Sequence, residues 1–265
     1  MDPFAHNDEQ DNRAYLNPDY GHGVFRRKIR LTATGNTVVG ELEDCAHGFR
    51  CRLTHDGQVL TDIVGESLRT PYDICIGATE PIKLFIGQPI DISLVSLNQE
   101  VNARSNCTHL YDLSALALEF CYLSSTQGIS ERIIDVLIPD ENEGAVTARV
   151  LIDGEEILAW QLQSWQIVGP EPIAGKPMHR GFAAWVNEMF SGLQNTAAFV
   201  LQKSYLVGEA RRYDIDAVAG QTAVTDSKML GICYTYSEQH IGQGKRLAGT
   251  MRDFTDCEEQ LLQFR

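Results

Sequence analysis

The alternation of apolar and polar residues limits the fold of this chain more than any other feature. A period of two sends successive side chains to opposite faces of a strand. Four such segments follow one another between Val24 and Leu68, with Asp56-Gly57 between the last two. Asp-Gly is a strong hairpin signal because the turn needs positive φ. The stretch therefore predicts a four-stranded antiparallel meander with one polar face. The strands are expected at 24–31, 37–42, 49–53 and 59–64.

A second block of strands is expected in the middle of the chain. Arg132–Ile138 is an almost continuous apolar run, and Val146–Ile152 alternates up to a second Asp-Gly turn at Asp153-Gly154. Glu155–Val168 would be the return strand of that hairpin. A final strand is expected at Met229–Glu238, where apolar side chains recur at every second residue.

Helical periodicity follows each block of strands. Asn195 is a good N-cap for the last of these helices, and Arg211-Arg212 suit its negative C-terminal end. The order of elements lacks regular βα alternation, and the chain has no GxGxxG or P-loop motif. It therefore predicts an α+β fold, with an antiparallel β-meander and hairpins packed with helices. Helices are expected at 81–86, 91–103, 107–123, 180–193 and 196–213.

Residues 1–23 are polar and predict a flexible N-terminal arm. As an alternative, this arm drapes over a dimer partner through Phe4, Tyr15 and Tyr20. Residues 24–265 are expected to form a single α+β domain. Two halves, 24–128 and 129–265, are conceivable because each holds a hairpin with an Asp-Gly turn followed by two helices.

Composition indicates an ordinary globular protein and disfavours some partners. The net charge of −14, from 22 basic and 36 acidic residues, argues against binding to nucleic acid or to an anionic membrane. The seven cysteines are scattered and form no CxxC pair, which favours reduced thiols in a cytoplasmic protein. The sequence shows no signal peptide and no apolar run of transmembrane length. A homodimer is expected from base rates alone.

The segment from Asn106 to Leu113 is the strongest candidate site. Cys107 is expected at the first position of a helix, where the helix dipole lowers the pKa of a thiol. His109 would act as a base, and Asp112, three residues further on, could orient its ring. The alternative is that Cys107 is packing and that His109 only caps the helix.

Metal binding is a further alternative for this segment. Cys107 and His109 could be joined by Cys75, His179 or Asp44, but no HxH or HExxH spacing supports such a site. We therefore expect neither a metal nor another cofactor.

Other residues are candidates for binding substrate or transferring protons. His179 and Arg180 begin a helix after a proline-rich loop and could hold an anion. Arg212 could clamp a carboxylate, although its place at a helix end already explains it. Tyr234 and Tyr236 would share one face of a strand and could donate protons or contact an aromatic ligand, or they could be cross-strand packing.

Two motifs resemble a bacterial family catalogued as domain of unknown function 2889 (DUF2889). They are Pro71-Tyr72 followed by Cys75-Ile76-Gly77-Ala78, and the segment Cys107-Thr108-His109-Leu110 at the start of a helix. Gly181-Phe182-x-x-Trp185 and Arg252-Asp253-Phe254 are also similar to the family, so the resemblance covers about residues 24–255. It favours Tyr72, Cys75, Cys107 and His109 as site residues, and it implies a place in the catabolism of aromatic or steroid compounds.

These observations together predict a cofactor-independent lyase or hydrolase that acts on a small aromatic or polycyclic catabolite. The release of formaldehyde from a lignin-derived side chain is an example, because it needs only a base and an acid. His109, Asp112, Cys107, Tyr72 and Tyr234 would be catalytic. The substrate-binding residues would be His179, Arg180, Arg212, Tyr236 and Cys75. The alternatives are a non-catalytic module that binds a small ligand and a metal-dependent enzyme that uses the Cys/His cluster.

Overall fold

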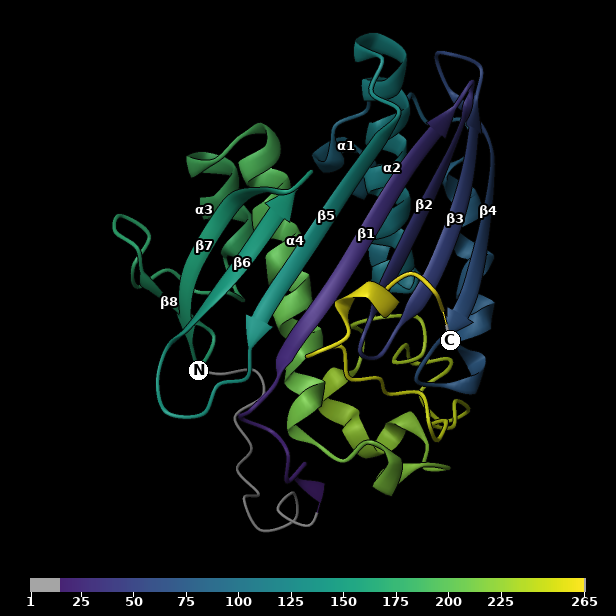
Figure 1. The fold of residues 1–265 in the computed structure, drawn as a ribbon. Coiled ribbons are helices and arrows are strands. Elements are labelled where there is room, and N and C mark those ends of the chain that lie inside the picture. Colours follow the sequence, from purple (N-terminus) through teal and green to yellow (C-terminus); the bar gives the residue numbers. More distant parts are fainter. Residues whose placement is uncertain (1–14, 265) are drawn as a thin grey trace.

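The computed structural model describes residues 15–264. Eight strands form one antiparallel sheet in the order β4-β3-β2-β1-β5-β6-β7-β8 (Figure 1). This architecture confirms the α+β fold and the four-stranded meander at its start. The strands are β1 (Val24–Thr34), β2 (Thr37–Asp44), β3 (Gly48–His55), β4 (Leu60–Arg69), β5 (Glu131–Pro139), β6 (Val146–Ile152), β7 (Glu155–Gln163) and β8 (Gln166–Gly169).

The hairpin turns fix the register of the sheet. Asp153 (φ 52°) and Gly154 (φ 83°) both adopt the positive φ that the Asp-Gly signal between β6 and β7 requires. The turn after Thr34 pairs this residue with Thr37, and Arg27 then lies opposite Asp44. In the centre, β1 pairs with β5 along its length and joins the two groups of four strands.

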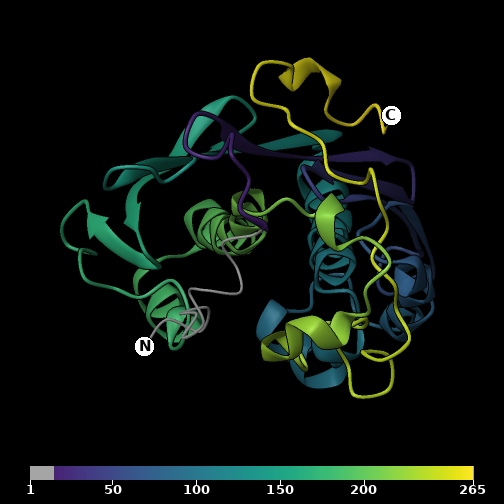
Figure 2. The same ribbon diagram turned by 90° about the horizontal axis from the view of Figure 1, so that it is seen from below.

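The four α-helices of residues 15–264 lie on one face of the arched sheet (Figure 2). The long helix α2 packs on β1, β2 and β3, whereas α4 packs on β5, β6 and β7. Between the helices and the sheet lies the core, to which β1 contributes Phe25, Ile29 and Leu31 from alternate positions. The helices are α1 (Leu94–Glu100), α2 (Thr108–Gln127), α3 (Phe182–Met189) and α4 (Gly192–Gly208). None of the described helices is long and apolar enough to cross a membrane.

Two of the expected strands are wrong or incomplete. Residues 229–238 form turns, because Gly231 has φ 79° and its amide donates to the carbonyl of Tyr236 within the same segment. Of its alternating apolar residues only Tyr236 is buried, and Leu230 stays 50% exposed. The return strand expected at 155–168 is broken by Ser164 (φ 48°) and Trp165 (φ 65°), and forms β7 and β8.

The last expected helix is also displaced. The helix α4 begins at Gly192 with Ser191 as N-cap, so Asn195 lies inside it and is not the cap. It ends at Gly208, and Arg211 and Arg212 lie in the short 3₁₀ helix η5 (Glu209–Arg212) that follows.

The part of the expected N-terminal arm that is described packs against the domain. The carbonyl of Tyr15 accepts from the amide of Asp214, and the amide of Asn17 donates to the carbonyl of Arg212. The hydroxyl of Tyr20 accepts from the amide of Glu141 at 3.1 Å. These contacts involve residues 15–20 of the expected arm, while Phe4 and the rest of 1–14 lie outside the described residues.

Candidate active site

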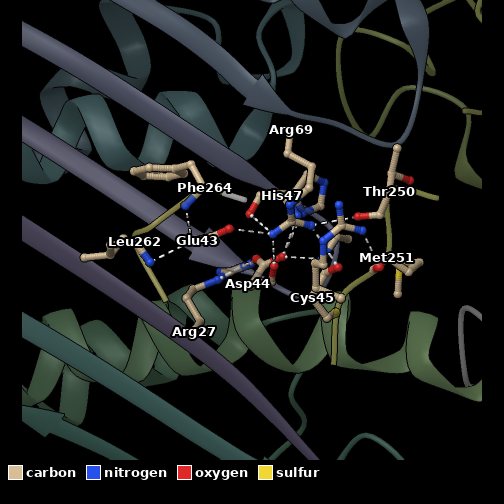
Figure 3. Close-up of polar contacts among 12 residues, drawn as sticks. Arg27, Glu43, Asp44, Cys45, His47, Arg69, Thr250, Met251, Leu262 and Phe264 are labelled. Carbon is tan, nitrogen blue, oxygen red and sulfur yellow. Dashed lines mark hydrogen bonds and ion pairs between the residues drawn. The ribbon is translucent and has the colours of Figure 1, made fainter. Parts of the chain in front are cut away.

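A buried ion pair anchors the site to the sheet. Arg27 points into the otherwise apolar face of β1, and Asp44 lies opposite it at the end of β2. Nε and Nη2 of Arg27 donate to Oδ2 of Asp44 at 2.9 and 2.6 Å. Both side chains are buried, so the two charges compensate each other away from water. Figure 3 shows the pair beneath the strands.

The other carboxylate oxygen of Asp44 shapes the turn between β2 and β3. Oδ1 accepts from the amides of Ala46 and His47 at 2.8 and 2.9 Å, and it lies 3.2 Å from Nδ1 of His47. Burial alone would raise the pKa of Asp44, but the charge of Arg27 and the contact with His47 hold it well below its usual range. Asp44 therefore stays ionised and fixes both the turn and the His47 ring.

A second buried arginine, Arg69, donates hydrogen bonds to the backbone of the same turn (Figure 3). Nη2 of Arg69 donates to the carbonyls of Asp44 and His47 at 2.6 and 3.2 Å and to Oε1 of Glu43 at 3.1 Å. Its Nη1 donates to the carbonyls of Cys45 and Thr250 at 3.0 and 2.8 Å. The turn that carries His47 is thus held on both sides by charged groups.

His109 lies on α2 and stacks on His47. The ring centroids are 4.2 Å apart, with an angle of 23° between the planes. Burial, together with the nearby charges of His47 and Arg27, holds the pKa of His109 well below its usual range. The ring is half-buried, and its nitrogens form no hydrogen bond with another residue in the described part of the chain. The lowered pKa favours a neutral His109 imidazole, and no residue from 15 to 264 forms a hydrogen bond with its nitrogen atoms.

Asp112 follows His109 on the same face of α2, because residues three apart are neighbours on a helix. Its Oδ2 lies 3.8 Å from Nζ of Lys203 on α4, which is an ion-pair distance and too long for a hydrogen bond. Burial raises the pKa of Asp112, although Lys203 and Arg27 oppose this shift. The side chains of Asp112 and Lys203 keep 35% and 34% of their surface exposed, whereas Oδ2 of Asp112 is itself buried and has no hydrogen-bond partner among the described residues.

Cys107 differs from the expectation of an activated thiol. It is the N-cap residue of α2, one position before the helix, and its side chain is buried. Burial raises the pKa of Cys107 well above its usual range, and the N–H groups of the helix end do not overcome this effect. The predicted lowering of the thiol pKa is therefore wrong.

Three of the other predicted residues, Tyr72, Cys75 and Tyr236, gather in a separate cluster. The hydroxyls of Tyr72 and Tyr236 are 2.9 Å apart, and Nη2 of Arg246 donates to Tyr72 at 2.7 Å. Cys75 Sγ lies 3.2 Å from the hydroxyl of Thr235. Burial raises the pKa of both tyrosines, so they are poor acids at neutral pH. This cluster fastens residues 220–246 to the segment after β4.

Tyr234 and Tyr236 do not form the expected strand face, because the segment is not a strand. The ring of Tyr234 stacks instead on His240 with the centroids 4.0 Å apart. Its amide donates to the carbonyl of Asn106, so it contacts the chain just before α2.

The predicted anion-binding residues lie in other parts of the fold. His179 precedes α3, and its Nδ1 accepts from the amide of Arg180, whose side chain is exposed. Arg212 already pairs with Glu141 and Glu209 at 3.2 and 3.0 Å, so it is no open carboxylate clamp. Over residues 15–264, no group of three or more His, Cys, Asp or Glu side chains is arranged to hold a metal ion.

Of the site residues that the sequence did not indicate, Arg27 alone had a clear signal. Arg27 stands in phase with Phe25, Ile29 and Leu31, and a charge in the apolar phase of a strand needs a buried partner. No pattern in the sequence singles out His47, which lies between two of the expected strands. Lys203 reaches the site through tertiary packing, for which no short-range pattern exists.

Comparison with known proteins leaves the family open. No protein-family model matches the chain, and no curated protein matches it. The similarity of the Cys-Thr-His-Leu segment to DUF2889 therefore stays a prediction.

Proposed function

We propose that this protein is an enzyme that catalyses an acid–base reaction on a small organic molecule, with His109 as the base and Asp112 as the acid. The observation that carries the proposal is the opposite pKa shift of two neighbouring groups. The pKa of His109 is lowered and that of Asp112 is raised, on one face of α2. Environments that separate the pKa values of two titratable groups are typical of acid–base assignments.

The surroundings suit these roles. The stack on His47 fixes the His109 ring, while Asp44 and Arg69 fix His47 through the turn. A base must present a free lone pair in a defined direction, and the ring nitrogens of His109 are not used by the described residues. Lys203 beside Asp112 supplies a positive charge that can stabilise a developing oxyanion.

A lyase reaction on an aromatic side chain fits this pair and balances without an oxidant or reductant. In an aryl-substituted 1,3-diol, His109 accepts the proton of the primary hydroxyl. The carbon–carbon bond between the hydroxyl-bearing carbon and its neighbour then breaks, and formaldehyde is released. The electron pair of that bond forms a carbon–carbon double bond, while the second hydroxyl leaves as water after Asp112 protonates it. The aromatic substrate class rests on the resemblance of the Cys-Thr-His-Leu segment alone.

Turnover of a 1,2-diaryl-1,3-propanediol, followed by trapping of formaldehyde, tests the assignment. We expect His109→Gln to lower the rate at least about a hundredfold, as loss of a general base usually does. Asp112→Asn should lower it as well, because the amide cannot supply a proton. His179→Gln is the matched control and should keep the wild-type rate, since His179 lies before α3.

An unchanged rate for His109→Gln would rule out this mechanism. A wild-type protein that turns over none of a panel of such diols, with a His109→Gln variant that only loses stability, would favour the non-catalytic ligand-binding module. Cys107→Ala should keep the rate, because the thiol is buried and has a raised pKa.

A further inference from the structure

The imidazole of His47 is bound at one edge by a buried carboxylate (Figure 3). Its Nδ1 lies 3.2 Å from Oδ1 of Asp44, whose side chain has no exposed surface. Burial opposes the ionisation of Asp44, but the charge of Arg27 holds its pKa well below the usual range. An ionised carboxylate only accepts hydrogen bonds. Nδ1 of His47 therefore carries a hydrogen atom and donates it to Asp44.

This bond leaves Nε2 as the open edge of the His47 ring. Nδ1 keeps its hydrogen in both protonation states of the ring, so any proton that His47 exchanges is the one on Nε2. Over residues 15–264, Nε2 of His47 has no hydrogen-bond partner, yet it is not one of the buried polar atoms without a partner, so it contacts solvent. The side chain of His47 is 11% exposed. A mostly buried ring with one solvated nitrogen presents that atom to small molecules.

The direction of this nitrogen is fixed by the surroundings of the ring. Asp44 cannot turn away, because its Oδ2 accepts two hydrogen bonds from Arg27 and its Oδ1 accepts from two amides of the turn. The His47 ring also stacks on His109 and on Phe49, with centroids 4.2 and 5.8 Å away and angles of 23° and 20°. A carboxylate that holds an imidazole in one tautomer and one orientation prepares the histidine for proton transfer.

His47 and His109 suit opposite roles in such a transfer. Burial lowers the pKa of His109, and the charge of His47 lowers it further, so a proton on His47 keeps His109 neutral. Of the two rings, His47 is therefore the donor and His109 the acceptor. A 1,3-diol can contact both rings, because their centroids are only 4.2 Å apart.

We propose that Asp44 and His47 form a carboxylate–imidazole dyad whose Nε2 atom exchanges a proton with the substrate, which makes His47 a further catalytic residue beside His109. This role rests on the proposed function. In the diol reaction His109 gains the proton of the primary hydroxyl, and protonated His47 gives its Nε2 proton to the departing hydroxyl. Asp112 and His47 are thus alternative donors of the one proton that this hydroxyl needs. The proton on His109 then returns to His47 through solvent, so one diol yields one alkene, one formaldehyde and one water.

The dyad is tested without a substrate. Long-range ¹H–¹⁵N NMR of the full chain, labelled with ¹⁵N-histidine and measured in alkaline solution, shows which nitrogen of each neutral imidazole carries the hydrogen. We expect hydrogen at Nδ1 in His47. His179 is the internal control and should carry hydrogen at Nε2, because its Nδ1 accepts from the amide of Arg180 at 2.8 Å. Hydrogen at Nε2 in neutral His47 would overturn the dyad.

Two variants separate proton transfer from support of the His109 ring. His47→Phe keeps an aromatic ring against His109 but has no nitrogen, and His47→Asn keeps a donor for Asp44 but has no Nε2. We expect each to lower the rate of formaldehyde release from a 1,2-diaryl-1,3-propanediol at least about tenfold. His179→Phe is the matched control and should keep the wild-type rate. A wild-type rate for either His47 variant would show that Nε2 is not needed and would overturn the catalytic role.

Rescue by a small molecule gives a readout that lost packing would not move. His47→Ala leaves space for a five-membered ring, and imidazole in solution should raise the rate of this variant at least about tenfold. Pyrazole has the same shape but is too weak a base to carry a proton at neutral pH, so it should restore no activity. Equal recovery with the two compounds, or recovery with neither, would overturn the catalytic role.

Failure of the proposed function has a different outcome. A wild-type protein without turnover would contradict the proposed function and the catalytic role of His47 with it, whereas the tautomer of His47 would still decide whether the dyad exists. Turnover that depends on His109 but is unchanged in His47→Phe would contradict the role of His47 alone.

Discussion

At the scale of single residues, the site depends on a charge that the fold places in its core. The turn at Gly35-Asn36 makes Thr34 and Thr37 the first pair of the hairpin, and the same register puts Arg27 opposite Asp44. This pair could therefore have been found from the sequence. The lowered pKa of His109 and the raised pKa of Cys107 could not, because burial decides both.

Loss of the buried carboxylate should destabilise the protein strongly. Asp44→Asn leaves Arg27 without a counter-charge, which typically costs about 3–5 kcal/mol in a buried pair. Asp135→Asn on β5 is the control, because Asp135 pairs with Lys28 of β1 at 3.3 Å but both side chains are partly exposed. Its loss should cost less than about 1 kcal/mol. Urea unfolding measures both, and equal costs would contradict a special role for the buried pair.

His109 should make stability fall in mildly acidic solution. In the unfolded chain the imidazole takes up a proton near pH 6.5, whereas burial keeps it neutral in the folded protein to a lower pH. The unfolded state therefore binds more protons, and the free energy of unfolding decreases as the pH falls below about 6.5. His109→Gln removes this contribution, which has a slope of at most about 1.4 kcal/mol per pH unit. Unfolding curves for both proteins between pH 7.5 and 5.5 test it, and parallel losses would show that His109 titrates normally.

At the scale of elements, prediction succeeded where the local chain determines the structure. The hairpins of the sheet were found because turn residues and period-two alternation agree with each other. Residues 229–238 have the same alternation but form turns, since Gly231 at φ 79° reverses the chain and Tyr234 binds to Asn106 before α2. A period-two pattern of apolar residues therefore does not by itself distinguish a strand from a series of turns.

The end of α2 offers a test of local backbone control. Gly128 closes the helix at φ 70°, and a Cβ atom there would meet no other atom within 4 Å. Gly128→Ala should therefore cost about 1–2 kcal/mol through the backbone conformation alone. Gly242→Ala is the control, because Gly242 also has open space around it but no positive φ. If thermal or urea unfolding shows the same cost for both, the left-handed cap is not what stabilises this end.

At the scale of the whole molecule, the sheet consists of two similar groups of strands. Both β1–β4 and β5–β8 are meanders followed by helices, and they meet at the antiparallel pair β1–β5. In the sequence, each half likewise holds a hairpin with an Asp-Gly turn followed by two expected helices. The candidate site lies where the halves face each other, because His109 and Asp112 come from α2 and Lys203 from α4.

The C-terminal segment ties the molecule together in a way that no sequence pattern indicated. It returns from the second half and crosses the face of the sheet opposite the helices (Figure 2). There Glu43, only 1% exposed, accepts from the amides of Leu262 and Phe264 at 2.6 and 3.2 Å (Figure 3). Such contacts between distant parts of a chain depend on the finished sheet and have no local signature.

Removal of residues 258–265 should therefore destabilise the sheet through Glu43. The carboxylate would lose two amide donors, and hydrogen bonds to a charged group contribute about 1.5–3 kcal/mol each. Water will satisfy part of this loss, so we expect a net cost of about 2 kcal/mol or more in urea unfolding. The same truncation in a Glu43→Gln background should cost clearly less, because the neutral amide is a weaker acceptor. A double-mutant cycle with the full-length chain isolates this interaction. Additive costs would mean that the tail stabilises the sheet by covering its apolar surface, and that Glu43 is not its anchor.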